Sequence, residues 1–259
     1  MKLLLLFTIL LSMPSFAERI CFTGDTGTGK IDQYIMADAM FRAGCFNIVI
    51  AGDLIYDKGL KDENDLQFHQ KFLIPYAKLM NYAKFYLVLG NHDYSGDQKA
   101  WFKISEKYPN IIIPHYYHSA YIDGVCLTMF DSYYKGIKQT NWLREQAKAE
   151  CKVKVAVNHW PYKSSGWHKN ANFPHNIFMK MWVMGKFDYL ITGHDHQLSD
   201  EGDYKGTRML ISGAGAKVRS LLRKPGVWGS SKLGFIIMDT ETLEVKFVDK
   251  DLRELHKVN

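Results

Sequence analysis

The chain has 259 residues, of which 47% are hydrophobic, and this is enough material to bury one sizeable α/β core. The formal net charge of +6 is a mild basic excess, which suits anionic substrates and is also common on solvated surfaces. No arginine-rich run or aromatic stacking platform accompanies this charge, so the composition does not indicate a nucleic-acid partner.

Residues 1–17 differ in composition from the rest of the chain. A basic start at Lys2 is followed by a leucine-dense run over residues 3–11 and by small residues up to Ala17. This order is typical of a Sec-type signal peptide cleaved after Ala17, and it predicts an exported mature chain, secreted or periplasmic, without stable membrane insertion. The alternative is an uncleaved N-terminal anchor, although the apolar run is short for a membrane span.

Apolar runs and helical spacings alternate along the predicted mature domain, residues 18–259. Strands are expected over residues 20–23, 46–51, 85–89, 153–157, 189–192, 209–212, 234–239 and 243–248. Helices are expected over residues 31–43, 64–80, 97–108, 139–150 and 177–184. Pro75 should kink or split the second helix, and Asp123-Gly124 predicts a hairpin between residues 117–122 and 125–130. The order is mixed α/β, with parallel strands first and antiparallel strands later.

The four cysteines leave two interpretations open. Cys21, Cys45, Cys126 and Cys151 could form two disulfides in an exported chain, with three pairings available. Alternatively, Cys21 and Cys126 lie in apolar strand-like runs, where a free cysteine is often a small buried hydrophobe. No CxxC pair is present, so the spacing does not indicate a cysteine metal site.

Five polar motifs each follow a predicted strand. They are Gly24-Asp25-Thr26-Gly27, Gly52-Asp53-Leu54-Ile55-Tyr56, Gly90-Asn91-His92-Asp93, Asn158-His159-Trp160-Pro161 and Gly193-His194-Asp195-His196. Open α/β sheets build their sites at the carboxyl ends of strands, where these motifs fall. Carboxylate, amide, imidazole and phenolate groups are ligands suited to Fe, Zn or Mn. The sequence therefore predicts two adjacent metal ions, which together can clamp a phosphoryl group and activate a water.

Each motif alone has a simpler interpretation. A Gly-Asp pair after a strand is often a turn or a helix cap, which applies to Asp25 and Asp53. Tyr56 could pack beside the site with its hydroxyl on the backbone, and His194 and His196 could be a surface pair. Five such motifs in one order argue against coincidence.

The order of the motifs resembles the calcineurin-like metallophosphoesterases and, more closely, the purple acid phosphatases of the small tartrate-resistant type. That family reads D-x-G, G-D-x-x-Y, G-N-H-D/E, V-x-x-H and G-H-x-H, and the similarity covers nearly the whole mature chain. It implies a mixed-sheet α/β/β/α sandwich. Ala156 replaces the valine of V-x-x-H, which should affect packing rather than ligation. Residues 131–142 are shorter than the protease-sensitive loop of mammalian members, so we do not expect proteolytic activation.

The resemblance also implies the role of each site residue. The ligands of a ferric ion would be Asp25, Tyr56 and His196, those of a divalent Fe, Zn or Mn ion would be Asn91, His159 and His194, and Asp53 would bridge the two ions. His92 would protonate the leaving group, and Asp93 would orient its neighbours. His168, nine residues after His159, matches a second substrate-facing histidine of animal members, although a surface loop histidine remains the alternative.

The implied function is that of a binuclear metal-dependent acid phosphatase. Its substrate would be a small phosphomonoester, and a metal-bound hydroxide would attack phosphorus. One alternative is a Mn- or Zn-dependent phosphodiesterase or nucleotidase of the same superfamily. A second is a non-catalytic phosphate- or metal-binding protein on the same fold.

Overall fold

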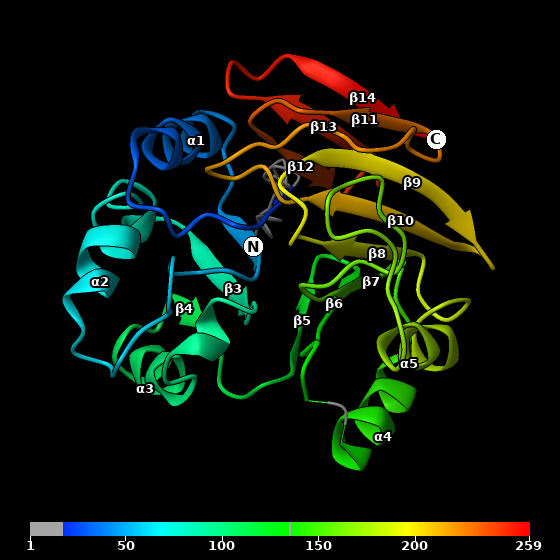
Figure 1. Ribbon diagram of the computed structural model, residues 1–259, viewed down its shortest axis with the longest axis horizontal. Coiled ribbons are helices and arrows are strands. Elements are labelled where there is room, and N and C mark those ends of the chain that lie inside the picture. Colours follow the sequence, from blue (N-terminus) through cyan, green and yellow to red (C-terminus); the bar gives the residue numbers. More distant parts are fainter. Residues whose placement is uncertain (1–17, 135) are drawn as a thin grey trace, which may run out of the picture.

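The computed structural model describes residues 18–134 and 136–259, so the predicted signal peptide lies outside the described residues. Two seven-stranded sheets pack face to face, with helices on the outer side of each (Figure 1). The first sheet holds, in spatial order, β14 (Glu254–Val258), β13 (Val245–Asp249), β12 (Gly234–Asp239), β1 (Arg19–Thr23), β2 (Asn47–Ala51), β3 (Lys84–Val88) and β4 (Ile111–Ile112). This arrangement confirms the predicted α/β/β/α fold class.

The second sheet, like the first, contains both parallel and antiparallel strand pairs. Its strands, in spatial order, are β11 (Trp228–Ser230), β9 (Leu198–Tyr204), β10 (Thr207–Ser212), β8 (Tyr189–Thr192), β7 (Val153–Val157), β6 (Val125–Met129) and β5 (His118–Ile122). The pairs β1–β2, β2–β3 and β3–β4 are parallel, as are β6–β7, β7–β8 and β8–β10. The central strand β1 also pairs antiparallel with β12, so the first sheet joins both ends of the described chain.

The helices cover the outer faces of the two sheets. They are α1 (Ile31–Arg42), α2 (Leu66–Phe68), α3 (Lys99–Lys107), α4 (Ile137–Gln146) and α5 (His175–Trp182). In Figure 1, α1, α2 and α3 lie on the side of the first sheet, and α4 and α5 lie beside the second. Met40 and Trp101 are buried under the first sheet's helices, whereas Leu143 and Met179 are buried under those of the second.

A third apolar layer lies between the two sheets. Phe22 and Val49 from the first sheet pack in one cluster with Leu127 and Val155 from the second, and all four are fully buried. Burying side chains of this size stabilises the fold by roughly 1.5–3 kcal/mol each, which holds the strand ends of both sheets in fixed relative positions.

Several expected elements differ from those in the structure. The helix expected over residues 64–80 is broken into α2, a π-helix at His69–Leu73 and a 3-10 helix at Leu79–Asn81, with Pro75 in the break. Strands β4, β9, β11 and β14 were not predicted, because they are very short or rich in polar residues. The predicted hairpin is present, and Asp123 and Gly124 both have positive φ, as a tight two-residue turn requires. In the described part of the chain, no helix has both the length and the apolar character that a bilayer span needs.

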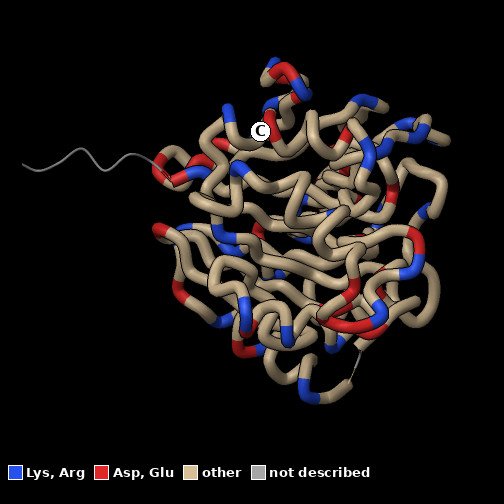
Figure 2. Tube along the Cα trace, turned by 90° about the vertical axis from the view of Figure 1, so that its left-hand side faces the viewer, with Lys and Arg blue, Asp and Glu red and all other residues tan. Residues whose placement is uncertain are grey.

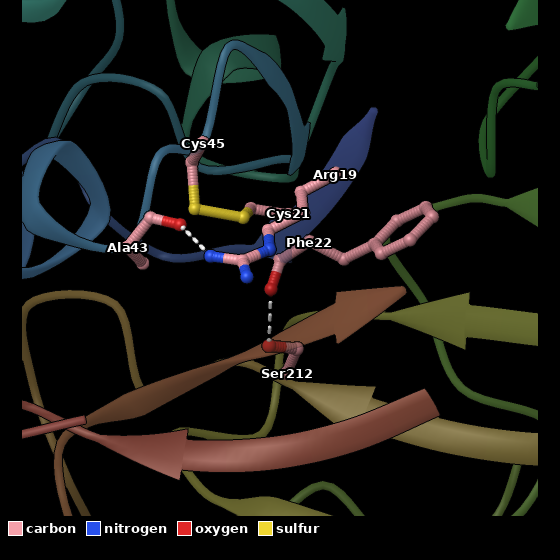
Figure 3. Close-up of a disulfide and its surroundings, with 6 residues drawn as sticks. All are labelled: Arg19, Cys21, Phe22, Ala43, Cys45 and Ser212. Carbon is pink, nitrogen blue, oxygen red and sulfur yellow. Dashed lines mark hydrogen bonds between the residues drawn. A yellow bond between two sulfur atoms is a disulfide. The ribbon is translucent and has the colours of Figure 1, made fainter. Parts of the chain in front are cut away.

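Both disulfides form in the structure, which settles the pairing that the sequence left open. Cys21 on β1 bonds to Cys45 just after α1, and Cys126 bonds to Cys151 (Figure 3 shows the first pair). Beside the first pair, Arg19 donates to the carbonyl of Ala43 at 2.7 Å. Each disulfide thus ties a strand to a neighbouring connection.

Charged residues are spread around the outside of the molecule. In the view of Figure 2, Lys and Arg segments alternate with Asp and Glu segments, and the strands crossing the middle are mostly uncharged. The basic excess is therefore not gathered on that face.

Candidate metal centre

The strand-end residues of both sheets meet at one edge of the sandwich. Asp25 follows β1, Asp53 follows β2 and His194 follows β8, and each has a left-handed φ of 54–69°. Such a conformation is uncommon for residues other than glycine and tends to occur at functional sites, where the surrounding structure enforces it. Here the backbone N–H of His194 donates to Asp25 Oδ2 at 2.8 Å, which joins the end of β8 in one sheet to the end of β1 in the other.

Three of the predicted ligands form a first group, the Tyr56 cluster, made of Asp25, Tyr56 and His196. The Tyr56 hydroxyl lies 3.0 Å from Asp25 Oδ1 and 3.1 Å from His196 Nε2. His196 Nε2 also lies 3.4 Å from Asp25 Oδ1. Three different side-chain donors therefore converge on one small volume.

Three others form a second group, the His159 cluster, made of Asn91, His159 and His194. His159 Nε2 lies 3.0 Å from Asn91 Oδ1 and 3.2 Å from His194 Nδ1. The two clusters contain the two ligand sets that the sequence predicted separately.

Asp53 stands between the clusters and faces both. Its Oδ2 atom accepts from the Tyr56 hydroxyl at 2.9 Å, and its Oδ1 atom lies 3.4 Å from His159 Nε2. Ligand atoms of Asp25, Asp53 and His159 all lie within 4.8 Å of one another. All seven predicted metal ligands are thus brought together, with one carboxylate shared.

The hydrogen-bond chemistry of the His159 cluster fits a cation. His159 Nδ1 lies 2.7 Å from the carbonyl of Ala51, which can only accept, so Nδ1 carries the proton. The lone pair of Nε2 therefore faces the side-chain oxygens of Asn91 and Asp53, which also accept. With its proton on Nδ1, His159 has none to give to these two oxygens, and a metal ion between buried acceptors removes the cost of placing them together.

The electrostatics of the Tyr56 cluster also indicate that the centre can hold a cation. Burial raises the pKa of Asp25 to about 8, with a further contribution from the Asp53 carboxylate, and burial also raises the pKa of Tyr56. Burial lowers the pKa of His196 to about 4, helped by the charges of Arg219 and Lys217. In the described residues no lysine or arginine pairs with Asp25 or Asp53, so the compensating positive charge must come from elsewhere.

The loops that carry the ligands are tied to one another by Asp93, as the sequence predicted. Its carboxylate accepts from the backbone N–H groups of Leu54 and Gly90 at 3.1 and 2.8 Å. It thereby joins the turn after β2 to the turn after β3. Gly52 is required nearby, because a Cβ at its φ of +89° would lie 2.4 Å from His159 Nδ1.

His92 lies at the mouth of the centre rather than inside it. Its Nδ1 atom is 2.5 Å from the carbonyl of Asp57, so Nδ1 donates and Nε2 is left free. Nε2 lies 3.9 Å from Asp53 Oδ2, and the side chain is one-third exposed. The position suits a group that exchanges a proton with a substrate.

His168 also lies at the rim of the centre. Its ring centroid is 3.9 Å from that of His194, and its backbone N–H donates to Asp195 Oδ1 at 3.0 Å. Together with Trp160 and Asn172, His168 and His194 line a hollow of about 270 Å³. The structure therefore places His168 beside the predicted ligands and not on a remote loop.

Several residues that surround the centre belong to none of the predicted ligand or proton-transfer groups. Arg219 and Lys217 lie on the connection from β10 to β11 and act electrostatically on His196. Asp195 holds the loop that carries His168, through the hydroxyl of Ser164 and the N–H of His168. Asp195 could have been found from the sequence, because it stands between two predicted ligands. No sequence pattern indicates that Arg219 lies near the centre.

Comparison with known proteins agrees with this geometry. Residues 18–198 match the model of the calcineurin-like phosphoesterase family, and the chain belongs to that family. It is a metallophosphatase, a hydrolase of phosphate esters. Purple acid phosphatase 4 of Arabidopsis thaliana is 29% identical over 229 residues, which cover 75% of this chain and 67% of that protein. Tartrate-resistant acid phosphatase type 5 of Rattus norvegicus is 27% identical over 198 residues, which cover 65% of this chain and 60% of the rat protein.

Solved structures share the fold at lower identity. GAP50 of Plasmodium, described as the anchor in the inner membrane complex, superposes with a TM-score of 0.77 at 20% identity, covering 93% of this chain and 88% of that one. A purple acid phosphatase from yellow lupin seeds superposes with a TM-score of 0.74 at 12% identity, covering 94% of this chain and 53% of that one.

Proposed function

We propose that this protein is a binuclear metallophosphatase that hydrolyses phosphomonoesters at acidic to neutral pH. The observation that carries the proposal is the position of Asp53, whose two oxygens face two separate donor clusters. The carboxylate and phenol oxygens of the Tyr56 cluster suit Fe(III), and the imidazoles and amide of the His159 cluster suit a divalent Fe, Zn or Mn ion. Bound there, two cations would neutralise the phosphoryl oxygens and lower the pKa of a water.

The chain's own residues supply positioning and proton transfer. Because its Nδ1 donates to the Asp57 carbonyl, His92 presents Nε2 at the mouth of the centre, where it can protonate a leaving oxygen. His168 lies on the opposite loop, against His194, and can assist the same leaving group. Asp93 keeps the two ligand loops in register while this happens.

We also propose that the protein acts outside the cytoplasm, in the periplasm or the surrounding medium. The pattern of residues 1–17 supports export, and two disulfides are typical of oxidising compartments. Cell fractionation of the native protein, with N-terminal sequencing of the mature chain, tests this: a mature N-terminus at Glu18 is the expected result.

The function is tested by measuring metal content and turnover on the same purified protein. We expect close to two metal ions per chain after reconstitution with Fe and Zn, and release of phosphate from an aryl phosphomonoester. A metal content near zero would contradict the binuclear centre.

The same assay separates the rival functions. Much faster turnover of a diester than of a monoester would favour a phosphodiesterase. Full metal loading with no turnover of any phosphoester would favour a non-catalytic role on this fold.

A further inference from the structure

We propose that Arg219 and Lys217 form a cationic arm that selects phosphoesters whose leaving-group side carries a second anionic group, a carboxylate or another phosphate. This inference rests on the proposed function, because it assigns the reacting phosphate to the metal centre. Both residues lie on the connection between β10 and β11, which reaches the strand-end edge of the sandwich (Figure 1).

Arg219 is the better positioned of the two cations. Its backbone N–H donates to the carbonyl of His196 at 2.8 Å, so its Cα is fixed beside a predicted ligand. Its guanidinium Nη1 lies 3.4 Å from His168 Nε2 at the rim of the centre. The side chain is half-buried, which restricts where its head group can lie.

The backbone beyond Arg219 is anchored as firmly. The N–H groups of Leu222 and Arg223 both donate to the carbonyl of Ser165 at 3.0 Å. Ser165 is itself held by Glu201, which accepts from its N–H at 2.9 Å and its hydroxyl at 2.6 Å. The loop that carries Arg219 and the loop that carries His168 are therefore fixed to each other, and the cation is pre-organised.

Lys217 adds a second positive charge on the same side. Its ammonium lies over the ring of Tyr56, 5.9 Å from the ring centroid. In the described part of the chain, neither Lys217 nor Arg219 has a carboxylate within ion-pair distance, whereas Arg42, Lys103 and Arg208 do. Two positive charges held beside a phosphate site, with no protein anion to neutralise them, are available to an anion on the ligand.

The test measures binding of phosphonates, which cannot be hydrolysed, to the metal-loaded protein by calorimetry. Methylphosphonate carries one anionic group, phosphonoacetate adds a carboxylate, and methylenebisphosphonate adds a second phosphonate. The wild type should bind one or both of the doubly anionic probes about tenfold more tightly than methylphosphonate, the gain expected from one charge-assisted hydrogen bond. The probe that gains identifies the second anion as carboxylate or phosphate.

Variants on the same loop assign that preference to Arg219. Arg219→Met should abolish it, and Arg219→Lys should keep part of it, because the charge remains without the planar fork. Lys224→Met is the matched control: it removes one exposed charge from the same loop and should preserve the preference. The melting temperature of each variant verifies that it is folded.

Three outcomes would overturn the inference: a wild type without preference, a wild type that binds none of the probes, or a preference that survives in Arg219→Met. The last would mean that the metals themselves hold the second anion. Turnover of an aryl phosphomonoester and of 3-phosphoglycerate, which carries a carboxylate, is measured in parallel. The absence of turnover of both would refute the proposed phosphatase function, whereas the binding result alone decides whether the cationic arm exists.

Discussion

The hydroxyl of Tyr56 and the Nε2 atom of His196 lie 3.1 Å apart, although 140 residues separate them in the sequence. The same hydroxyl contacts carboxylate oxygens of Asp25 and Asp53. Among the described residues, the hydrogen-bond partners of this hydroxyl are all predicted metal ligands.

We expect iron-loaded protein to be purple or pink, because a phenolate bound to Fe(III) donates charge into the metal and absorbs visible light. Tyr56→Phe should bleach the colour while the protein stays folded and keeps its other ligands. The visible spectrum, recorded together with the iron content, measures this. Tyr133→Phe is the control, since Tyr133 is 39% exposed, contacts Trp160 in a tilted ring pair and belongs to neither cluster. A colourless wild type with full iron content would refute the assignment of Tyr56.

Replacement of His92 by alanine should lower kcat by about 10²–10⁴-fold, the usual contribution of a general acid. The metal content should remain unchanged, because His92 lies outside both clusters. Steady-state kinetics on an aryl phosphate, with metal analysis of the same sample, measures both quantities. His115→Ala serves as the control, since its ring packs on Phe102. Full activity of His92→Ala across the pH range would remove His92 from the mechanism.

The two disulfides should contribute unequally to stability. Their loops are nearly equal, with separations of 24 and 25 residues, so the restriction of the unfolded chain by each bond should raise the free energy of unfolding by about 3.5 kcal/mol. Cys21 and Cys45 are fully buried in the core under α1, whereas Cys126 and Cys151 are partly exposed. The double change of Cys21 and Cys45 to alanine also opens a cavity, so it should cost more than the same change at the other pair. Urea unfolding of both variants measures the difference, and equal losses would contradict it.

His118 should make the protein less stable below pH 6.5. Burial lowers the pKa of this histidine from 6.5 to about 4, and its Nε2 atom lies 2.9 Å from the carbonyl of Leu87 in the opposite sheet. The unfolded chain gains a proton below pH 6.5 that the folded chain does not. The stability that the neutral, buried His118 allows is therefore fully present above pH 6.5. The free energy of unfolding falls by about 3 kcal/mol as the pH is lowered to about 4.

Denaturant unfolding between pH 4 and 8 measures this loss, with His118→Gln as the comparison. Glutamine does not titrate, so the variant should lose less stability over the same interval. Parallel pH curves for the two proteins would show that His118 does not titrate as expected.

The part of the site that could be predicted from the sequence is the set of polar side chains that lie at strand ends. Five of the predicted ligands lie two or three residues beyond the end of a parallel strand: Asp25, Asp53, Asn91, His159 and His194. The carboxyl ends of parallel strands share one edge, so the alternation of apolar runs and polar motifs places these residues together without any knowledge of the loops.

The surroundings of the site were not predictable in this way. Arg219 meets His168 only because Ser165, Leu222 and Arg223 join two loops through backbone bonds, which leave no sequence pattern. Strand β9 was missed because its sequence is polar. Its Asp200 is nevertheless fully buried, since Arg208 and His256 pair with it. Tertiary partners decide such segments, and local propensity does not.

The position of β1 in the first sheet affects the order in which parts of the fold can form. Its two neighbours are β2, which follows within about thirty residues, and β12, which begins at Gly234 near the end of the chain. A nascent chain can pair β1 on one side early, but the other edge stays open until β12 has left the ribosome. If the chain is exported unfolded, as the proposed location requires for a Sec-type signal, this edge of β1 can be paired only after β12 has crossed the membrane. Asp25, a predicted ligand that lies two residues after β1, would then be among the last parts of the site to be fixed in place.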